Sequence, residues 1–191
     1  MTVLIAGLLL FLGIHSVRIF AEAWRTRQLA RLGEARWKGL YSLISALGLG
    51  LIVWGVGLSR ADPVMVWAPA AGMRHLAALL TLPAFILLVA AYVPGNRIKR
   101  AAGQPMAAGV ALWALAHLLS NGRLSDLLLF GGFLGWSALS FSAAQGRDRA
   151  VGVQRAGGSI ARDGLTVIIG VAAWAGFAAY LHVWMIGVRP F

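Results

Sequence analysis

Residues 76–93 read LAALLTLPAFILLVAAYV, a stretch without one charged side chain. The hydrocarbon core of a bilayer is about 30 Å thick, and an α-helix needs ~20 mostly apolar residues to cross it. Polar residues flank this stretch on both sides, with Arg74 before it and the sequence NRIKR at 96–100 after it. The pattern therefore predicts a transmembrane helix.

Five other stretches have the same apolar character, which extends the prediction to six transmembrane helices. They are expected at Val3–Trp24, Leu40–Leu58, Leu76–Val93, Met106–Ser120, Leu124–Phe141 and Leu165–Gly187. The fourth is short, and Pro105 offers it an earlier start because proline is tolerated in the first turn of a helix. We therefore predict an all-α fold, a polytopic membrane helix bundle, with residues 1–191 as a single domain.

The composition supports this fold class, since 60% of the residues are hydrophobic and only 12% are charged. Soluble proteins have about 25% charged residues.

No Lys or Arg precedes the first apolar stretch and no small-residue cleavage site follows it, so we interpret it as a retained helix rather than a signal peptide. The chain has no cysteine, which excludes disulfides, cysteine-bound zinc and iron–sulfur clusters.

The net charge of +11 is typical of nucleic-acid-binding proteins, but the positions of the charges argue against that function. Most Lys and Arg residues fall in the first, third and fifth connections between the predicted helices: Arg25, Arg27, Arg31, Arg36, Lys38, Arg97, Lys99, Arg100, Arg147, Arg149, Arg155 and Arg162. The other connections and the C-terminus hold only Arg60, Arg74, Arg123 and Arg189. Loops rich in Lys and Arg face the cytoplasm. Both termini are therefore predicted on the non-cytoplasmic side.

The predicted first helix carries three ionisable residues, His15, Arg18 and Glu22, on one stripe. Ionisable groups at membrane depth cost at least ~2.5–3.5 kcal/mol on insertion scales, so they usually serve a purpose. One interpretation is that Arg18 and Glu22 pair and extend to the membrane surface while His15 bonds a backbone carbonyl. The other is that the stripe faces an internal cavity, with Arg18 available to an anionic group.

A second polar stripe, formed by His117, Ser120 and Asn121, lies on the predicted fourth helix. His117 is interpreted either as an interhelical hydrogen-bonding residue or as a ligand of a metal or haem. Its estimated depth is close to that of His15. We therefore expect these two histidines to approach each other between the first and fourth predicted helices, either across a bound metal or haem or through a hydrogen bond. His75 and His182 are expected nearer the outer surface, in structural or solvated roles.

Small residues recur at a spacing of four in the pairs Ala46 and Gly50, and Gly131 and Gly135. Such pairs allow close approach of membrane helices, so we expect them to be packing sites.

Motifs for other chemistries are missing from the sequence. There is no Gly-rich phosphate loop and no HExxH motif, which argues against nucleotide hydrolysis and zinc proteolysis. No carboxylate pair lies at mid-membrane either.

The chain resembles the NnrU family of bacterial membrane proteins along essentially its full length. The matching stretches are GIHSVRIF at 13–20, WKGLYSL at 37–43, RHLAALLTLPAFILLVAAYVPGNRIK at 74–99, ALWALAHLLSNG at 111–122 and LLLFGGF at 127–133. The pieces with histidine and Asn-Gly are specific, whereas leucine-rich and alanine-rich pieces alone are not.

The resemblance implies a multi-pass protein of the bacterial inner membrane, linked to denitrification and nitric oxide metabolism. The plant zeta-carotene isomerase, which carries haem b on histidines, resembles a divergent relative of this family. This relation implies a haem b site here, and His15 and His117 are the positions that match family histidines. Family members usually have His-Pro where this chain has Gln104-Pro105. Glutamine is a poor ligand of haem iron, so this position departs from the family pattern.

Three functional interpretations stay open at this stage. The first is a haem-binding membrane protein, including a carotenoid-isomerase-like haem enzyme. The second is a cofactor-free membrane accessory protein that helps to express or assemble a partner complex; the partner is then another membrane protein, or the chain forms a homo-oligomer. A small transporter ranks last, because interrupted helix pairs and buried carboxylates are missing. The sequence assigns no catalytic residue and no substrate.

Overall fold

The protein is described by a computed structural model that covers residues 1–155 and 157–190. Helices account for nearly all of its regular structure. In chain order they are α1 Thr2–Phe20, α2 Glu22–Leu32, α3 Glu34–Ser59, α4 Met73–Tyr92, α5 Arg97–Ala102, α6 Pro105–Ser120, α7 Leu124–Ala150, α8 Ile160–Gly176, the π-helix η1 Phe177–Leu181 and α9 His182–Ile186. This confirms the all-α prediction.

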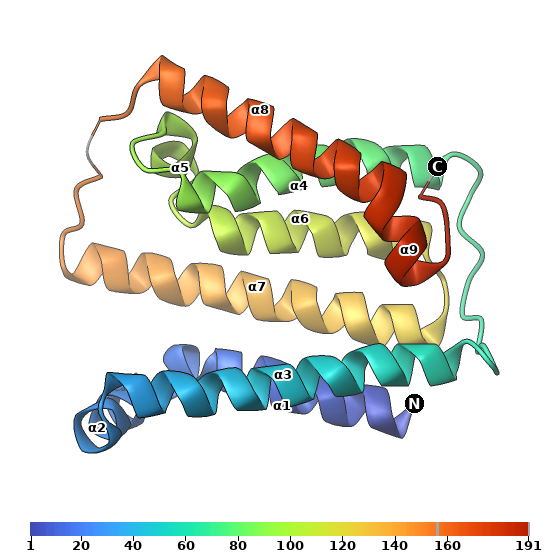
Figure 1. The fold of residues 1–191 in the computed structure, drawn as a ribbon, viewed down its shortest axis with the longest axis horizontal. Coiled ribbons are helices and arrows are strands. Elements are labelled where there is room, and N and C mark those ends of the chain that lie inside the picture. Colours follow the sequence, from blue (N-terminus) through green and yellow to red (C-terminus); the bar gives the residue numbers. More distant parts are fainter. Residues whose placement is uncertain (156, 191) are drawn as a thin grey trace.

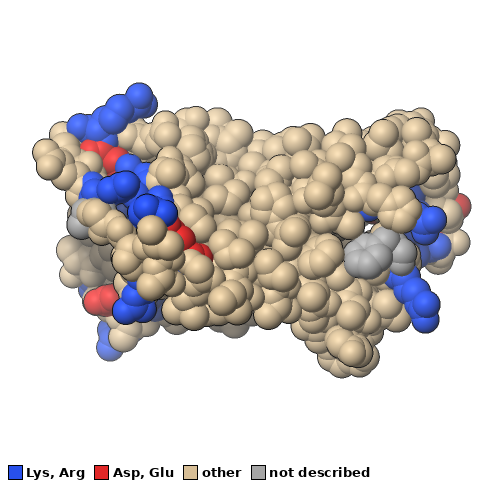
Figure 2. Space-filling view, turned by 90° about the horizontal axis from the view of Figure 1, so that it is seen from above, with Lys and Arg blue, Asp and Glu red and all other residues tan. Residues whose placement is uncertain are grey.

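Among the described residues, five helices are long and apolar enough to cross a membrane: α1, α3, α4, α7 and the continuous run from α8 to α9, Ile160–Ile186. The fourth predicted span, Met106–Ser120, corresponds to α6, which begins at Pro105 and has only 16 residues. At about 1.5 Å per residue α6 is roughly 24 Å long, shorter than a ~30 Å hydrocarbon core. Figure 2 shows Lys, Arg, Asp and Glu side chains gathered at the two ends of the molecule, with a band free of charged side chains between them on the face shown.

The long helices lie side by side, and α7 runs between two groups of them (Figure 1). On one side of α7 are α1 and α3, which pack closely together, and on the other side are α4, α6 and α8. The N-terminus and α9 lie at one end of the bundle, whereas α2, α5 and the link from α7 to α8 lie at the other (Figure 1). We call the latter the basic end, because the three connections rich in Lys and Arg meet there.

Glycine allows the backbones of α1 and α3 to touch. A Cβ atom on Gly7 would lie 2.6 Å from the backbone nitrogen of Ile52, and one on Gly48 would lie 2.7 Å from that of Phe11. The expectation for Gly50, Gly131 and Gly135 was wrong, because a Cβ on any of them would have no neighbour within 4 Å. A spacing of four places two residues on one helical face but does not say which face meets a neighbour.

Four predicted boundaries differ from the structure at the basic end, where α3 begins at Glu34 rather than Leu40 and α8 at Ile160 rather than Leu165. The first helix stops at Phe20 rather than Trp24, because Ala21 has φ −137° and ψ 39°, and α2 starts anew at Glu22. Helix α7 continues past the predicted end, Phe141, to Ala150. Its last turns are polar, and hydropathy marks where a helix leaves the membrane rather than where it ends. The end of the α7–α8 link is held by a hydrogen bond from the Ser159 N–H to the Gly95 carbonyl, 3.1 Å.

Candidate cavity at the basic end of the bundle

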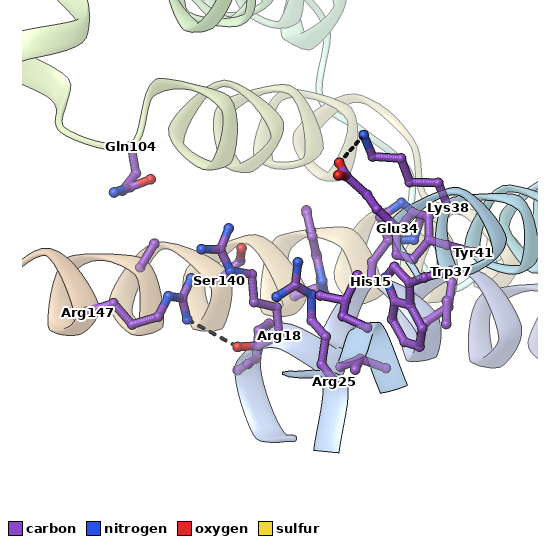
Figure 3. Close-up of a pocket in the computed structure, with 16 residues that line it drawn as sticks. His15, Arg18, Arg25, Glu34, Trp37, Lys38, Tyr41, Gln104, Ser140 and Arg147 are labelled. Atoms are coloured by element: carbon purple, nitrogen blue, oxygen red, sulfur yellow. Dashed lines mark hydrogen bonds and ion pairs between the residues drawn. The ribbon is translucent and has the colours of Figure 1, made fainter. Parts of the chain in front are cut away.

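A cavity of about 660 Å³ opens at the basic end, between the α1–α2–α3 segment and α7 (Figure 3). Gln104, directly before α6, completes its wall. The lining combines apolar, aromatic and charged side chains: Ile14, His15, Val17, Arg18, Ile19, Arg25, Leu29, Glu34, Trp37, Lys38, Tyr41, Gln104, Trp136, Ser140, Ala144 and Arg147. Two of the predicted site residues, His15 and Arg18, therefore line one cavity.

His15 is held in a defined orientation by its own helix. Its Nδ1 lies 2.6 Å from the carbonyl oxygen of Phe11, one turn earlier. A carbonyl only accepts hydrogen bonds, so Nδ1 carries the proton and donates it. The ring stacks on Phe11 at 4.2 Å between centroids and lies 5.1 Å from the ring of Tyr41. This arrangement leaves Nε2 with a lone pair, as in histidines that bind metal through one nitrogen and anchor the other.

Trp136 of α7 forms the cavity wall beside His15. The two rings meet edge to face, with their centroids 6.0 Å apart. The indole Nε1 of Trp136 is buried and has no hydrogen-bond partner among the described residues. A buried donor left without an acceptor costs roughly 1–3 kcal/mol. Trp136 therefore carries this cost inside the wall, since its Nε1 is closed off from the cavity and has no acceptor in the described part of the chain.

Four cations border the cavity: Arg18, Arg25, Lys38 and Arg147. Arg25 pairs with Glu22 at 2.9 Å and Lys38 pairs with Glu34 at 2.6 Å. The Arg147 guanidinium donates a hydrogen bond of 3.1 Å to the carbonyl oxygen of Arg18, at the end of α1. This bond ties α7 to the end of α1 across the cavity (Figure 3).

The predicted pair of Arg18 and Glu22 is present but loose, at 3.8 Å, and Glu22 has Arg25 as its closer partner. The Arg18 side chain is 62% exposed, so it lies at the rim of the cavity. The cause is the break at Ala21, which ends α1 one turn beyond His15. Arg18 is therefore placed at the surface of the bundle.

Gln104, the position that departs from the family pattern, lines the same cavity as His15. Its amide donates a hydrogen bond of 2.7 Å to the carboxylate of Asp148, which also pairs with Arg155. Gln104 precedes α6, whereas His15 lies on α1, so only the folded bundle brings them to one cavity. The amide is engaged with α7 and provides no imidazole.

His117 does not share this cavity. Its Nδ1 donates to the carbonyl oxygen of Trp113 at 2.8 Å, and its ring stacks on Phe130 at 4.6 Å. The bond is within its own helix, not between helices. Three rings separate it from His15, namely Phe11, Phe133 and Trp113 in successive contact.

The expected approach of His15 and His117 was therefore wrong. The two helices that carry them, α1 and α6, lie on opposite sides of α7 (Figure 1). Periodicity and depth place a residue along its own helix, but they do not determine the order of helices around a bundle.

Comparison with known protein families decides the classification. The model of the NnrU protein family matches residues 3–190. The chain belongs to the NnrU family. No curated protein and no solved structure matches it.

The two remaining histidines of this NnrU-family chain lie away from the cavity. His75 is exposed in the first turn of α4. His182 opens α9 after the π-helix, and its Nδ1 donates to the carbonyl oxygen of Val188 at 2.6 Å. Within residues 1–155 and 157–190, no group of three or more His, Asp or Glu side chains forms a metal site.

Proposed function

We propose that this NnrU-family protein is a multi-pass protein of the bacterial inner membrane that binds haem b beside His15 and serves denitrification and nitric oxide metabolism. The observation that supports this proposal is the cavity. It combines an imidazole with a free Nε2, aromatic walls and a rim of cations. The denitrification role rests on the family resemblance.

The residues of the cavity fit the chemical needs of haem b. Haem iron takes a histidine nitrogen as its axial ligand, and His15 is the histidine among the lining residues. Carboxylates are matched by arginine, and two arginines, Arg18 and Arg147, lie at the rim with Lys38. The volume of about 660 Å³ falls within the roughly 300–1,000 Å³ of cofactor sites.

Each group has a distinct role in this proposal. His15 would hold the iron through Nε2, because its Nδ1 is fixed to the Phe11 carbonyl. Arg18, Arg147 and Lys38 would hold the carboxylates at the rim, and the rings of Tyr41 and Trp136 would exclude water. Bound haem iron supplies redox chemistry and a coordination position for small molecules such as nitric oxide. Gln104 lines the same cavity with an amide rather than an imidazole, so His15 would be the one histidine that holds the group.

The orientation in the membrane is also proposed. The basic end, with its excess of Lys and Arg, faces the cytoplasm by the positive-inside rule. The cavity would then open on the cytoplasmic side, with both termini on the periplasmic side. Reporter fusions test this directly. A fusion after Phe191 is expected to report the periplasm and one in the loop at Arg97 the cytoplasm, and the reverse at either point would contradict the orientation.

The haem proposal is tested by the visible absorption spectrum of protein purified from haem-supplied cells. A Soret band in the wild type that is lost in His15→Ala supports it. The control is His117→Ala, which removes an imidazole outside the cavity and is expected to keep the band. A wild-type protein without any Soret band, even after addition of haem, would reject haem binding and favour the cofactor-free accessory role.

A further inference from the structure

The short helix α2 lies across the basic end of the bundle instead of along it. Figure 1 shows it almost end-on, next to α1 and α3, which run lengthwise. It begins immediately after α1 ends, at Ala21, and is followed by Gly33 with φ +78°, a conformation that favours glycine. Since α1 and α3 cross the membrane, a helix that lies across their ends runs along the membrane surface.

Helix α2 has two different faces. Arg25 and Leu29, four residues apart, line the cavity. Trp24, Arg27 and Arg31 are spaced by three and four, so they share one helical face, and all three are exposed. We call these three residues the outward face of α2. Trp24 is 44% exposed, and its ring meets that of Trp37 edge to face at 5.8 Å.

The charges of the outward face are not neutralised by the protein. The carboxylates of this end are each engaged by another cation: Glu22 by Arg25, Glu34 by Lys38, Asp148 by Arg155 and Asp163 by Arg97. Arg27 and Arg31 have no ion pair with any described residue. No carboxylate in the described part of the chain supplies their counter-charge, which leaves them available to an external anion.

We propose that the outward face of α2 binds anionic phospholipid headgroups of the membrane in which the bundle sits. Arg27 and Arg31 lie one turn apart, so both guanidinium groups reach phosphates at the same membrane depth. Tryptophan favours the interface between headgroups and acyl chains, and Trp24 occupies the same face. An interfacial helix with cations and an aromatic anchor binds a membrane through both features. Each Lys or Arg close to an anionic lipid surface increases the affinity for that surface about fivefold.

Native mass spectrometry of the full-length protein in zwitterionic detergent tests this proposal. Phosphatidylglycerol and phosphatidylcholine with identical acyl chains are supplied in equal amounts, and the retained lipid is counted. The wild type is expected to retain phosphatidylglycerol preferentially. The double variant Arg27→Gln with Arg31→Gln is expected to lower that preference about tenfold, whereas the lysine pair, Arg27→Lys with Arg31→Lys, is expected to keep most of it.

The matched control removes the same charge from the other end of the bundle, through Arg74→Gln with Arg189→Gln, both exposed residues. It is expected to change the preference less than twofold. Equal retention of the two lipids by the wild type would overturn the proposal. So would an equal loss in both glutamine variants, since the net charge alone would then explain the effect, or a loss in the lysine pair.

Discussion

His15 and His117 have nearly the same local arrangement in two different parts of the bundle. Each donates its Nδ1 proton to the carbonyl oxygen four residues earlier, at 2.6 Å and 2.8 Å, and each stacks on a phenylalanine, at 4.2 Å and 4.6 Å. They differ in what lies beyond these contacts. His15 lines a cavity with a cationic rim, whereas His117 packs against the rings of Trp113 and Phe130. The hydrogen bond within the helix holds a histidine in place, and the surrounding helices determine what it can bind.

The largest expected effect separates these two histidines. His15→Ala is expected to lower the affinity for haem more than a hundredfold, because it removes the proposed iron ligand. His117→Ala is expected to leave that affinity within twofold, yet to lower the free energy of unfolding by roughly 1–3 kcal/mol through loss of a hydrogen bond and ring packing. Haem titration and thermal unfolding measure the two quantities. Loss of haem affinity in both variants would remove the distinction drawn here.

The region around His15 depends on the contact between α1 and α3. Gly48→Leu is expected to lower the free energy of unfolding by about 3 kcal/mol or more, because a side chain there collides with the backbone of Phe11, whose carbonyl holds His15. Gly50→Leu introduces the same side chain on the same helix, where a Cβ meets nothing within 4 Å. It is expected to have little effect. Thermal stability in detergent compares the two, and equal stability of the variants would contradict the packing described.

The cationic rim is the next feature that sets the His15 region apart. Arg147→Gln is expected to weaken haem binding about tenfold, since a hydrogen bond to a charged group contributes ~1.5–3 kcal/mol. Arg149→Gln, two residues further along α7 and exposed, is the matched control and is expected to change haem binding less than twofold. If both substitutions weaken binding equally, the rim acts only through its overall charge.

The smallest change sharpens the comparison by adding an imidazole to the cavity. Gln104→His places a histidine on the wall that His15 also lines. The substitution removes the hydrogen bond to Asp148, 2.7 Å, so a loss of about 1 kcal/mol in stability is expected. If the new imidazole reaches the iron, the absorption spectrum changes to that of a bis-histidine site. An unchanged spectrum would show that residue 104 and His15 face different parts of the cavity.

The fold class and most spans could be predicted from the sequence because each apolar run is a local property. Leu76–Val93 and the helix α4, Met73–Tyr92, agree within a few residues. The order of helices around the bundle could not, since α7 lies between α1 and α6 and nothing in an apolar run identifies its neighbour. For the same reason the contact glycines Gly7 and Gly48 were missed.

The candidate site shows the same division between local and long-range information. His15 was predicted because an ionisable residue in an apolar helix is conspicuous. Trp136 and Arg147 were missed, because they lie on α7, far along the chain from α1. One signal could have indicated them. Trp136, Ser140, Ala144 and Arg147 are spaced by four, four and three, so one face of α7 changes from aromatic to small to cationic toward the basic end.

The most direct measurement of the central claim, that His15 holds the iron of haem b, is chemical rescue of His15→Gly. This variant removes the imidazole and leaves room for a free one. Purified variant protein is titrated with haem in the absence and presence of imidazole, and the Soret band is recorded. The account predicts weak, non-specific haem absorbance alone and a wild-type-like spectrum once imidazole is added. The same spectrum with and without imidazole, or full haem binding by the variant alone, would contradict it.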